Sequence, residues 1–123
     1  MAAPAEPKKE KPEWPWHESL DAMIAAPDHH RLVFENERMR VLDTVIPPGE
    51  TVPVHTNRWP AIYYHIVPGH IIRRDPDGNV LFDSRTGELQ PVFSASWLEF
   101  LPPHSVENVS PFAIHVVNVE LKD

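Results

Sequence analysis

The sequence predicts a single all-β domain, a sandwich or barrel built from about nine or ten short strands. Apolar and β-branched residues occur in short runs, and turn signals rich in Pro, Gly, Asp and Ser separate these runs about every eight to twelve residues. No strand-type run alternates with a long helical pattern, which argues against a parallel α/β sheet. Fifteen prolines among 123 residues also disfavour a helical bundle, because proline interrupts helices.

Length and composition describe one domain that needs no cross-links. A chain of 123 residues can bury enough surface to fold without a metal or a disulfide, and it contains no cysteine. The net charge of −7 disfavours a nucleic-acid or anionic-membrane surface, since phosphate binding needs an excess of Lys and Arg. The sequence shows neither a membrane-length apolar stretch nor a signal-type segment. We therefore expect a cytoplasmic protein with no nucleic-acid and no membrane partner.

Composition divides the chain into three segments. Residues 1–16 predict a mobile N-terminal arm, residues 17–29 a short helix and connector, and residues 30–123 the β-barrel. Two tryptophans at the end of the arm, Trp14 and Trp16, are unfavourable to leave in water. We expect this piece to dock on the domain or on a partner subunit.

One short helix is expected before the strands. Ser19 is its predicted N-cap, residues 20–26 form it, and Pro27 stops it. The side that it buries is expected to consist of Leu20, Met23 and Ile24. The next residues, His29 and His30, are interpreted as a polar connector.

The remaining chain reads as strands joined by turns. Pro47-Pro48-Gly49 predicts a type II turn in which glycine supplies the positive φ, and Pro102-Pro103 predicts a break between two strands. Arg73 and Arg74, beside Asp75, are interpreted as solvated charges at a strand end. The expected strands cover residues 31–34, 38–46, 51–57, 61–67, 70–74, 79–83, 97–101, 104–109 and 112–121.

Two segments carry the spacing of a known pair of motifs. Gly49 is followed after five residues by His55, and Gly69 closes the segment. Later, Pro102-Pro103 precedes His104, which is followed at H-x3-N spacing by Asn108. These segments resemble the first and second motifs of the small single-domain, RmlC-like cupins, and the resemblance covers about residues 30–122. It implies a jelly-roll barrel (a double-stranded β-helix), often dimeric, with a pocket lined by the two motif segments.

The metal-binding part of the motif is degenerate. In metal-binding cupins the ligands are two histidines and a glutamate of the first motif and a histidine of the second. His55 and His104 match two of these ligands, whereas Asn57 and Ile62 stand at the positions of the other two. Divalent metals bound tightly usually have three or four N or O ligands. The resemblance therefore implies a weak or lost site for a divalent metal such as Fe, Mn, Ni or Zn.

The direction in which side chains of the strand at residues 61–67 point decides whether His65 can serve as a further metal ligand. Alternation along residues 61–67 is expected to point Ile62, Tyr64 and Ile66 inward and His65 outward. His65 would then complete a metal site only if the register slipped by one residue.

The predicted ligand pocket collects the polar and aromatic residues of these segments. Arg58 and Trp59 either grip a carboxylate and stack on a ligand, or stiffen a barrel corner. The predicted pocket consists of His55, Asn57, Arg58, Trp59, Ile62, Tyr64 and His104.

Two classes of function follow, and the catalytic residues, if any, are unknown. The first is a cupin that binds a small organic ligand in its barrel, beside a degraded metal site. The alternative is a metal-dependent dioxygenase, isomerase or lyase that uses His55 and His104. We favour the first, because the ligand count required by the second is missing. A homodimer is the expected assembly, and a purely oligomeric accessory role is a third reading.

Overall fold

The computed structural model describes residues 14–122, which form two antiparallel β-sheets and three short helical segments. The predicted all-β class is confirmed, whereas the part of the predicted mobile arm before Trp14 lies outside the described residues. The elements are η1 (Glu18–Leu20), α1 (Ala22–Ala25), β1 (His30–Glu35), β2 (Met39–Ile46), β3 (Thr51–Asn57), β4 (Ala61–Val67), β5 (Ile71–Arg74), β6 (Val80–Asp83), η2 (Ser84–Thr86), β7 (Ser94–Leu98), β8 (Leu101–Asn108) and β9 (Ile114–Leu121).

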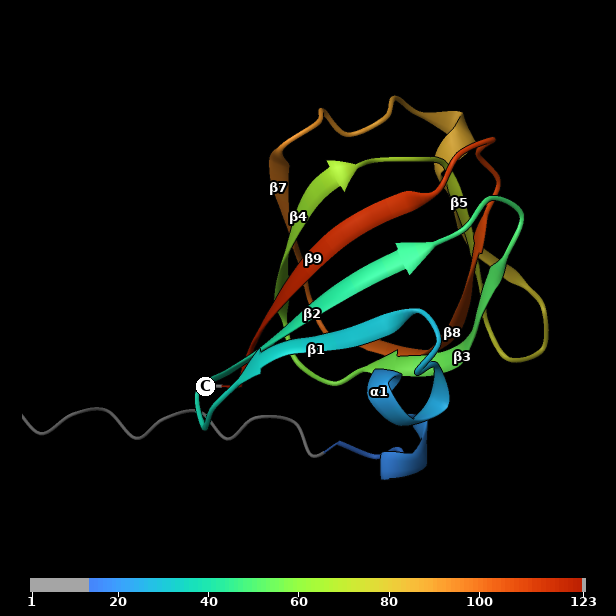
Figure 1. The fold of residues 1–123 in the computed structure, drawn as a ribbon. Coiled ribbons are helices and arrows are strands. Elements are labelled where there is room, and N and C mark those ends of the chain that lie inside the picture. Colours follow the sequence, from blue (N-terminus) through green and yellow to red (C-terminus); the bar gives the residue numbers. More distant parts are fainter. Residues whose placement is uncertain (1–13, 123) are drawn as a thin grey trace, which may run out of the picture.

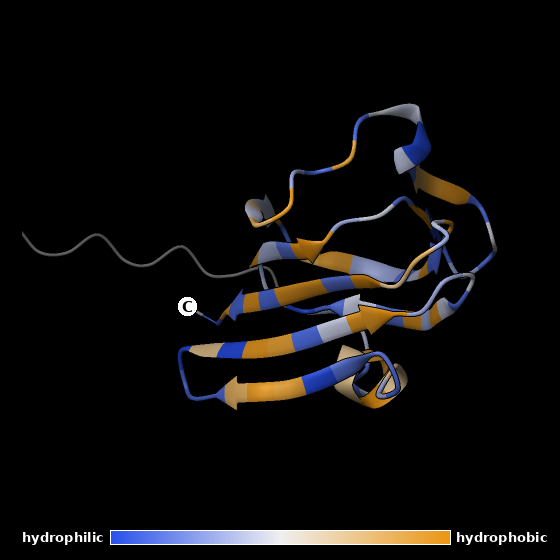
Figure 2. Ribbon diagram, turned by 45° about the horizontal axis from the view of Figure 1, so that its top comes forward, coloured by the Kyte–Doolittle hydropathy of each residue, from blue (hydrophilic) through white to orange (hydrophobic). Residues whose placement is uncertain are grey.

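The strands form a double-stranded β-helix. One sheet has the order β1-β2-β9-β4-β7 and the other the order β3-β8-β5-β6, so each sheet combines strands from distant parts of the chain (Figure 1). Apolar and polar residues follow one another along the strands (Figure 2), as expected for strands that turn one side to a core. A buried cluster joins the sheets and consists of Ala26, Ile46, Val52 and Ile114.

The helix is shorter than predicted and faces differently. It begins at Ala22, because the side chain of Asp21, not that of Ser19, accepts the cap hydrogen bond, from the Met23 amide at 3.1 Å. Ala22 and Ala26 are the residues buried here, and Ile24 is 61% exposed. The predicted apolar side is therefore wrong. Small residues let the helix lie directly against the outer side of β3, where Thr56 donates to the Leu20 carbonyl at 3.1 Å.

Two predicted turns had different outcomes. The type II turn is confirmed, because Gly49 has φ +79° and the Glu50 amide donates to the Pro47 carbonyl at 3.2 Å. The break at Pro102-Pro103 is wrong, because both prolines lie inside β8. They are tolerated there because the β3–β8 pairing is irregular between Leu101 and His104, so no regular ladder needs their missing N–H groups.

The side-chain amide of Asn108 links the β2–β3 connection to the β8–β9 connection by hydrogen bonds. Its Nδ2 donates to the carbonyls of Ile46, Pro47 and Phe112 at 2.9, 3.3 and 2.8 Å, and its Oδ1 accepts from the Ser110 amide at 2.8 Å. The side chain is fully buried and its donor and acceptor groups are all used. The asparagine of the second motif is therefore a structural residue of this fold.

At the described start of the chain, Trp14 lies on the barrel itself. Its ring meets Trp16 edge-on at 4.8 Å and Phe100 edge-on at 5.8 Å between centroids. Among the described residues, no helix is both long and apolar enough to cross a membrane.

Candidate functional site

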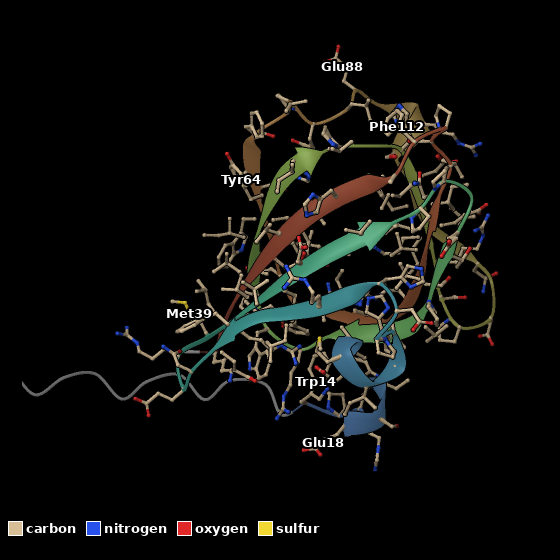
Figure 3. All side chains as sticks on the ribbon, viewed as in Figure 1. Trp14, Glu18, Met39, Tyr64, Glu88 and Phe112 are labelled. Atoms are coloured by element: carbon tan, nitrogen blue, oxygen red, sulfur yellow. The ribbon has the colours of Figure 1, made fainter. Side chains whose placement is uncertain are left out.

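A cavity of about 280 Å³ lies between the two sheets and is the candidate site. Strands of both sheets contribute to its wall, and residues 84–90, after β6, form part of its rim. Figure 3 shows Glu88 extending outward from this loop. The apolar part of the wall includes Ile46, Val52, Ile71, Leu101, Val106, Ile114 and Val116.

Two histidines face each other across neighbouring strands inside this cavity. His55 on β3 pairs in register with His104 on β8, and their ring centroids are 4.5 Å apart. From Val52 to His55, β3 advances three residues while β8 advances two, from Val106 to His104. On a regular strand Val52 and His55 would face opposite sides. The bulge lets both line the cavity, so it is the feature that turns His55 inward.

The two imidazoles are held in the same way. Each histidine stands two residues after a proline, and each Nδ1 lies 2.7 Å from that proline's carbonyl oxygen, which belongs to Pro53 or Pro102. A carbonyl oxygen can only accept, so Nδ1 carries the proton in both rings. The lone pair is then on Nε2. Within residues 14–122, no side chain or backbone group forms a hydrogen bond with either Nε2 atom.

Burial keeps both rings neutral. Desolvation lowers the pKa of His55 to about 3, and the neighbouring His104 adds to this effect. Desolvation also lowers the pKa of His104 to about 4. At neutral pH the cavity therefore offers two hydrogen-bond acceptors, the Nε2 atoms, and no imidazolium charge.

A third histidine joins the pair, and the sequence had not indicated it. His30 is buried at the start of β1, its ring centroid lies 5.0 Å from that of His55, and it lines the cavity. Its Nδ1 donates to the Ala26 carbonyl at 2.9 Å, and burial lowers its pKa. The interpretation of His30 as a polar connector is therefore wrong.

The donors do not form a metal site of the usual kind. No group of three His, Asp or Glu side chains among the described residues is arranged to hold a metal ion. The rings of His30, His55 and His104 lie close together, edge-on and tilted relative to one another, but their nitrogens do not form such a group. The residues present thus do not fit a divalent ion with three or four protein ligands.

Of the other predicted pocket residues, Asn57 lines the cavity. Its Nδ2 donates to the phenol oxygen of Tyr63, which also lines the cavity. Desolvation raises the pKa of Tyr63, so the phenol stays protonated at neutral pH. Deeper in the same wall, Thr44 donates to Asn118 at 3.1 Å. The pocket predicted from the sequence did not include Tyr63, Thr44 or Asn118.

The expected facing of β4 is wrong. Ile62 and Tyr64 are 38% and 39% exposed and do not line the cavity, whereas Tyr63 and His65 do. Because side chains alternate, an error of one residue in the phase exchanges the whole set. His65 forms a hydrogen bond with Ser96, and its Nε2 lies 2.8 Å from the Ser96 Oγ.

Arg58 and Trp59 form a corner outside the cavity lining. Three cations lie over the Trp59 ring at 5.0, 5.2 and 5.2 Å from its centroid, and they belong to Arg40, Arg58 and Lys122. Arg40 also pairs with Asp21 at 2.9 Å and with Glu120 at 3.1 Å. Of the two readings of this corner, these contacts favour a structural one.

Arg73 is a further lining residue that the sequence placed elsewhere. It was expected as a solvated charge, but it lies on β5 and lines the cavity together with Ile71. The expectation suits Arg74, which is partly exposed and pairs with Glu107 at 2.7 Å. A period-two reading from Ile71 would have indicated the inward position of Arg73.

Solved cupin structures share this fold. A cupin domain from Bordetella pertussis matches with a TM-score of 0.64 at 19% identity, over 76% of this chain and 92% of that chain. An RmlC-like cupin family protein with a double-stranded β-helix fold, from Methanocaldococcus jannaschii, matches with a TM-score of 0.54 at 14% identity, over 75% and 77%. The polyketide cyclase RemF from Streptomyces resistomycificus matches with a TM-score of 0.52 at 16% identity, over 80% and 68%. No protein-family model and no curated protein matches the chain.

Proposed function

The chain has the cupin fold, and we propose that its barrel binds a small organic molecule with an apolar body and a hydroxyl or N–H group. The observation that carries the proposal is the pair of neutral imidazoles, His55 and His104, whose Nε2 lone pairs have no hydrogen-bond partner among the described residues. Both atoms belong to residues that line the cavity, and polar groups of a ligand pocket fix the orientation of the bound molecule. A donor on a bound molecule would satisfy them.

The size and the wall of the cavity support the same proposal. Ligand pockets are mostly apolar with a few polar groups that fix orientation, and drug-sized ligands need roughly 300–1,000 Å³. A cavity of about 280 Å³ lined by residues such as Val52, Val106 and Val116 suits a smaller molecule. The apolar wall would supply most of the affinity, and the two imidazoles would supply the orientation.

The alternative, a metal-dependent enzyme, has less support. It needs at least one further ligand beside His55 and His104, and no third donor among the described His, Asp and Glu side chains converges with them. His65, which was the expected rescue, lines the cavity but pairs with Ser96.

The proposal is tested with neutral probes and two neighbouring variants. Benzyl alcohol, benzamide and phenylacetamide would be titrated with and without EDTA and followed by amide chemical shifts. Shifts are expected on β3, β8 and β9 of the wild type. Val116→Phe fills the cavity and should abolish them, whereas Val117→Phe, one residue further along β9 and outside the lining, should leave them unchanged.

Three results would count against the proposal. One is the absence of shifts with all three probes. Another is equal binding by Val116→Phe and by the wild type. The third is binding that EDTA removes, which would favour the metal-dependent alternative.

A further inference from the structure

Arg73 places a positive charge inside the cavity. It lines the wall on β5, and its Cζ lies 5.5 Å from the ring centroid of Phe82, which also lines the cavity. Its Nε atom is buried and has no hydrogen-bond partner among the described residues. A guanidinium group has five N–H donors in a fixed plane, so an unpaired buried donor is unfavourable unless something binds it.

No carboxylate of the described residues forms an ion pair with Arg73. Desolvation lowers its pKa, and the only group that acts in the opposite direction is the phenol of Tyr63. The carboxylates of the neighbouring strands have other partners, since Glu107 pairs with Arg74 at 2.7 Å and Glu120 pairs with Arg40. A charge buried without a counter-ion is unfavourable, and ligands often supply the missing partner.

The rest of the lining leaves this charge uncompensated. Among the described residues of the wall, Glu88 alone is acidic, and it is exposed on the loop after η2, where water screens it. Burial lowers the pKa of all four histidines that line the cavity, which are His30, His55, His65 and His104, and so favours their neutral form. The interior thus carries one cation and several neutral polar groups, although the whole protein has a net charge of −7.

We propose that the ligand of the barrel is a small organic acid whose carboxylate pairs with Arg73. The inference rests on the function proposed above and adds the chemical class of the ligand. A planar guanidinium matches the two oxygens of a carboxylate, and the pairing is stronger where the groups are partly removed from bulk water. The apolar body of the acid would lie against the valine and isoleucine wall, and an O–H or N–H group would face the imidazoles of His55 and His104.

The experiment compares acids with amides of the same shape. The pairs are benzoate with benzamide, phenylacetate with phenylacetamide, and hexanoate with hexanamide, titrated at pH 7 and followed by amide chemical shifts. Charge-assisted hydrogen bonds should make each carboxylate bind about tenfold or more tightly than its amide. This comparison uses the wild-type protein and needs no variant.

Two matched variants assign the preference to one residue. Arg73→Gln should lose the preference for carboxylates and keep its affinity for the amides within about threefold, because the glutamine side chain retains hydrogen-bonding capacity without the charge. Arg74→Gln removes the neighbouring guanidinium, which lies outside the lining, and should keep the preference. Thermal unfolding of each variant checks that it is folded.

The outcomes separate the two proposals. Equal binding of acids and amides by the wild type would overturn the carboxylate inference and leave the small-molecule function standing. Loss of the preference in Arg74→Gln but not in Arg73→Gln would overturn the assignment to Arg73. Failure of every acid and every amide to bind would overturn the proposed function itself.

Discussion

The two Pro-x-His segments explain how the barrel orients two buried imidazoles through backbone carbonyl groups. In each, the carbonyl two residues earlier accepts the Nδ1 proton and so fixes the tautomer and the ring orientation of His55 or His104. The same hydrogen bond satisfies the donor, and burial suppresses the charged form. At the scale of single residues, this histidine pair offers two neutral acceptors to the cavity.

The neutral histidines should make the protein sensitive to acid. The unfolded state takes up protons near pH 6.5, whereas folded His55 and His104 remain unprotonated down to about pH 3 and 4. Between about pH 6.5 and 4 the unfolded state therefore binds more protons, and the unfolding free energy should rise with pH. The slope is at most about 1.4 kcal/mol per pH unit for each histidine.

Urea unfolding between pH 4.5 and 7.5 measures this slope. His104→Gln should reduce it by the share of one histidine, whatever its effect on stability at pH 7.5. His17→Gln removes an exposed imidazole and serves as the control. An unchanged slope in His104→Gln would show that His104 is not buried in the neutral form.

Residue types in the motif segments could be predicted from the sequence, but their environments could not. His55, Asn57 and His104 were expected in the pocket and line the cavity. The position of Arg73 in the cavity wall was not predicted, because an arginine at a strand end beside an acidic turn is normally solvated. His30 was missed because its partner, His55, is distant in sequence.

At the scale of elements, small irregularities decide which side chains enter the barrel. The bulge between Val52 and His55 on β3 and the irregular pairing between Leu101 and His104 on β8 lie on either side of the histidine pair. Each changes the facing of the residues beyond it. A period-two reading assumes regular strands, so it cannot find such positions. On β4, Tyr63 and Tyr64 both look amphipathic, and only pairing with β9 and β7 sets the phase.

The connection from β4 to β5 depends on close contact with β9. A Cβ atom added at Gly69 would lie 2.5 Å from Cγ1 of Ile114 and 2.8 Å from Oγ of Ser110. Gly69→Ala should therefore lower the unfolding free energy by about 1–3 kcal/mol, the range found for overpacking. Denaturant unfolding measures this change.

Gly87→Ala is the matched control for this contact. A Cβ atom there meets no heavy atom within 4 Å, and the change in stability should stay within about 0.5 kcal/mol. Equal stability of the Gly69→Ala variant and the wild type would show that this connection does not pack against β9 as described.

At the scale of the whole molecule, the two sheets enclose a mainly apolar space with a few polar groups. The fold class was predictable because turn residues punctuate short apolar runs, a signal that needs no tertiary information. The position of α1 was not, since Ala22 and the C-cap residue Ala26 carry little pattern, yet both are buried where α1 contacts β3. The homodimer expected from the sequence stays a prediction.

The spacing of a motif alone does not predict the chemistry of the cavity. Ile62 stands where a metal ligand was expected, but the structure turns it out of the barrel, away from His55 and His104. The interior keeps the shape of a cupin barrel and replaces convergent ligands by separate polar groups, including Arg73 and Tyr63. We therefore propose ligand binding, rather than metal chemistry, as the role of this arrangement.

The most direct measurement of the central claim is the position of a neutral ligand in solution. Intermolecular nuclear Overhauser effects between the ring protons of phenylacetamide and the protein methyl groups would provide it. We expect contacts to the methyl groups of Val52, Val106 and Val116, which line the cavity. Contacts confined to exposed residues outside the lining, such as Val80 and Leu81 on β6, would contradict binding inside the barrel.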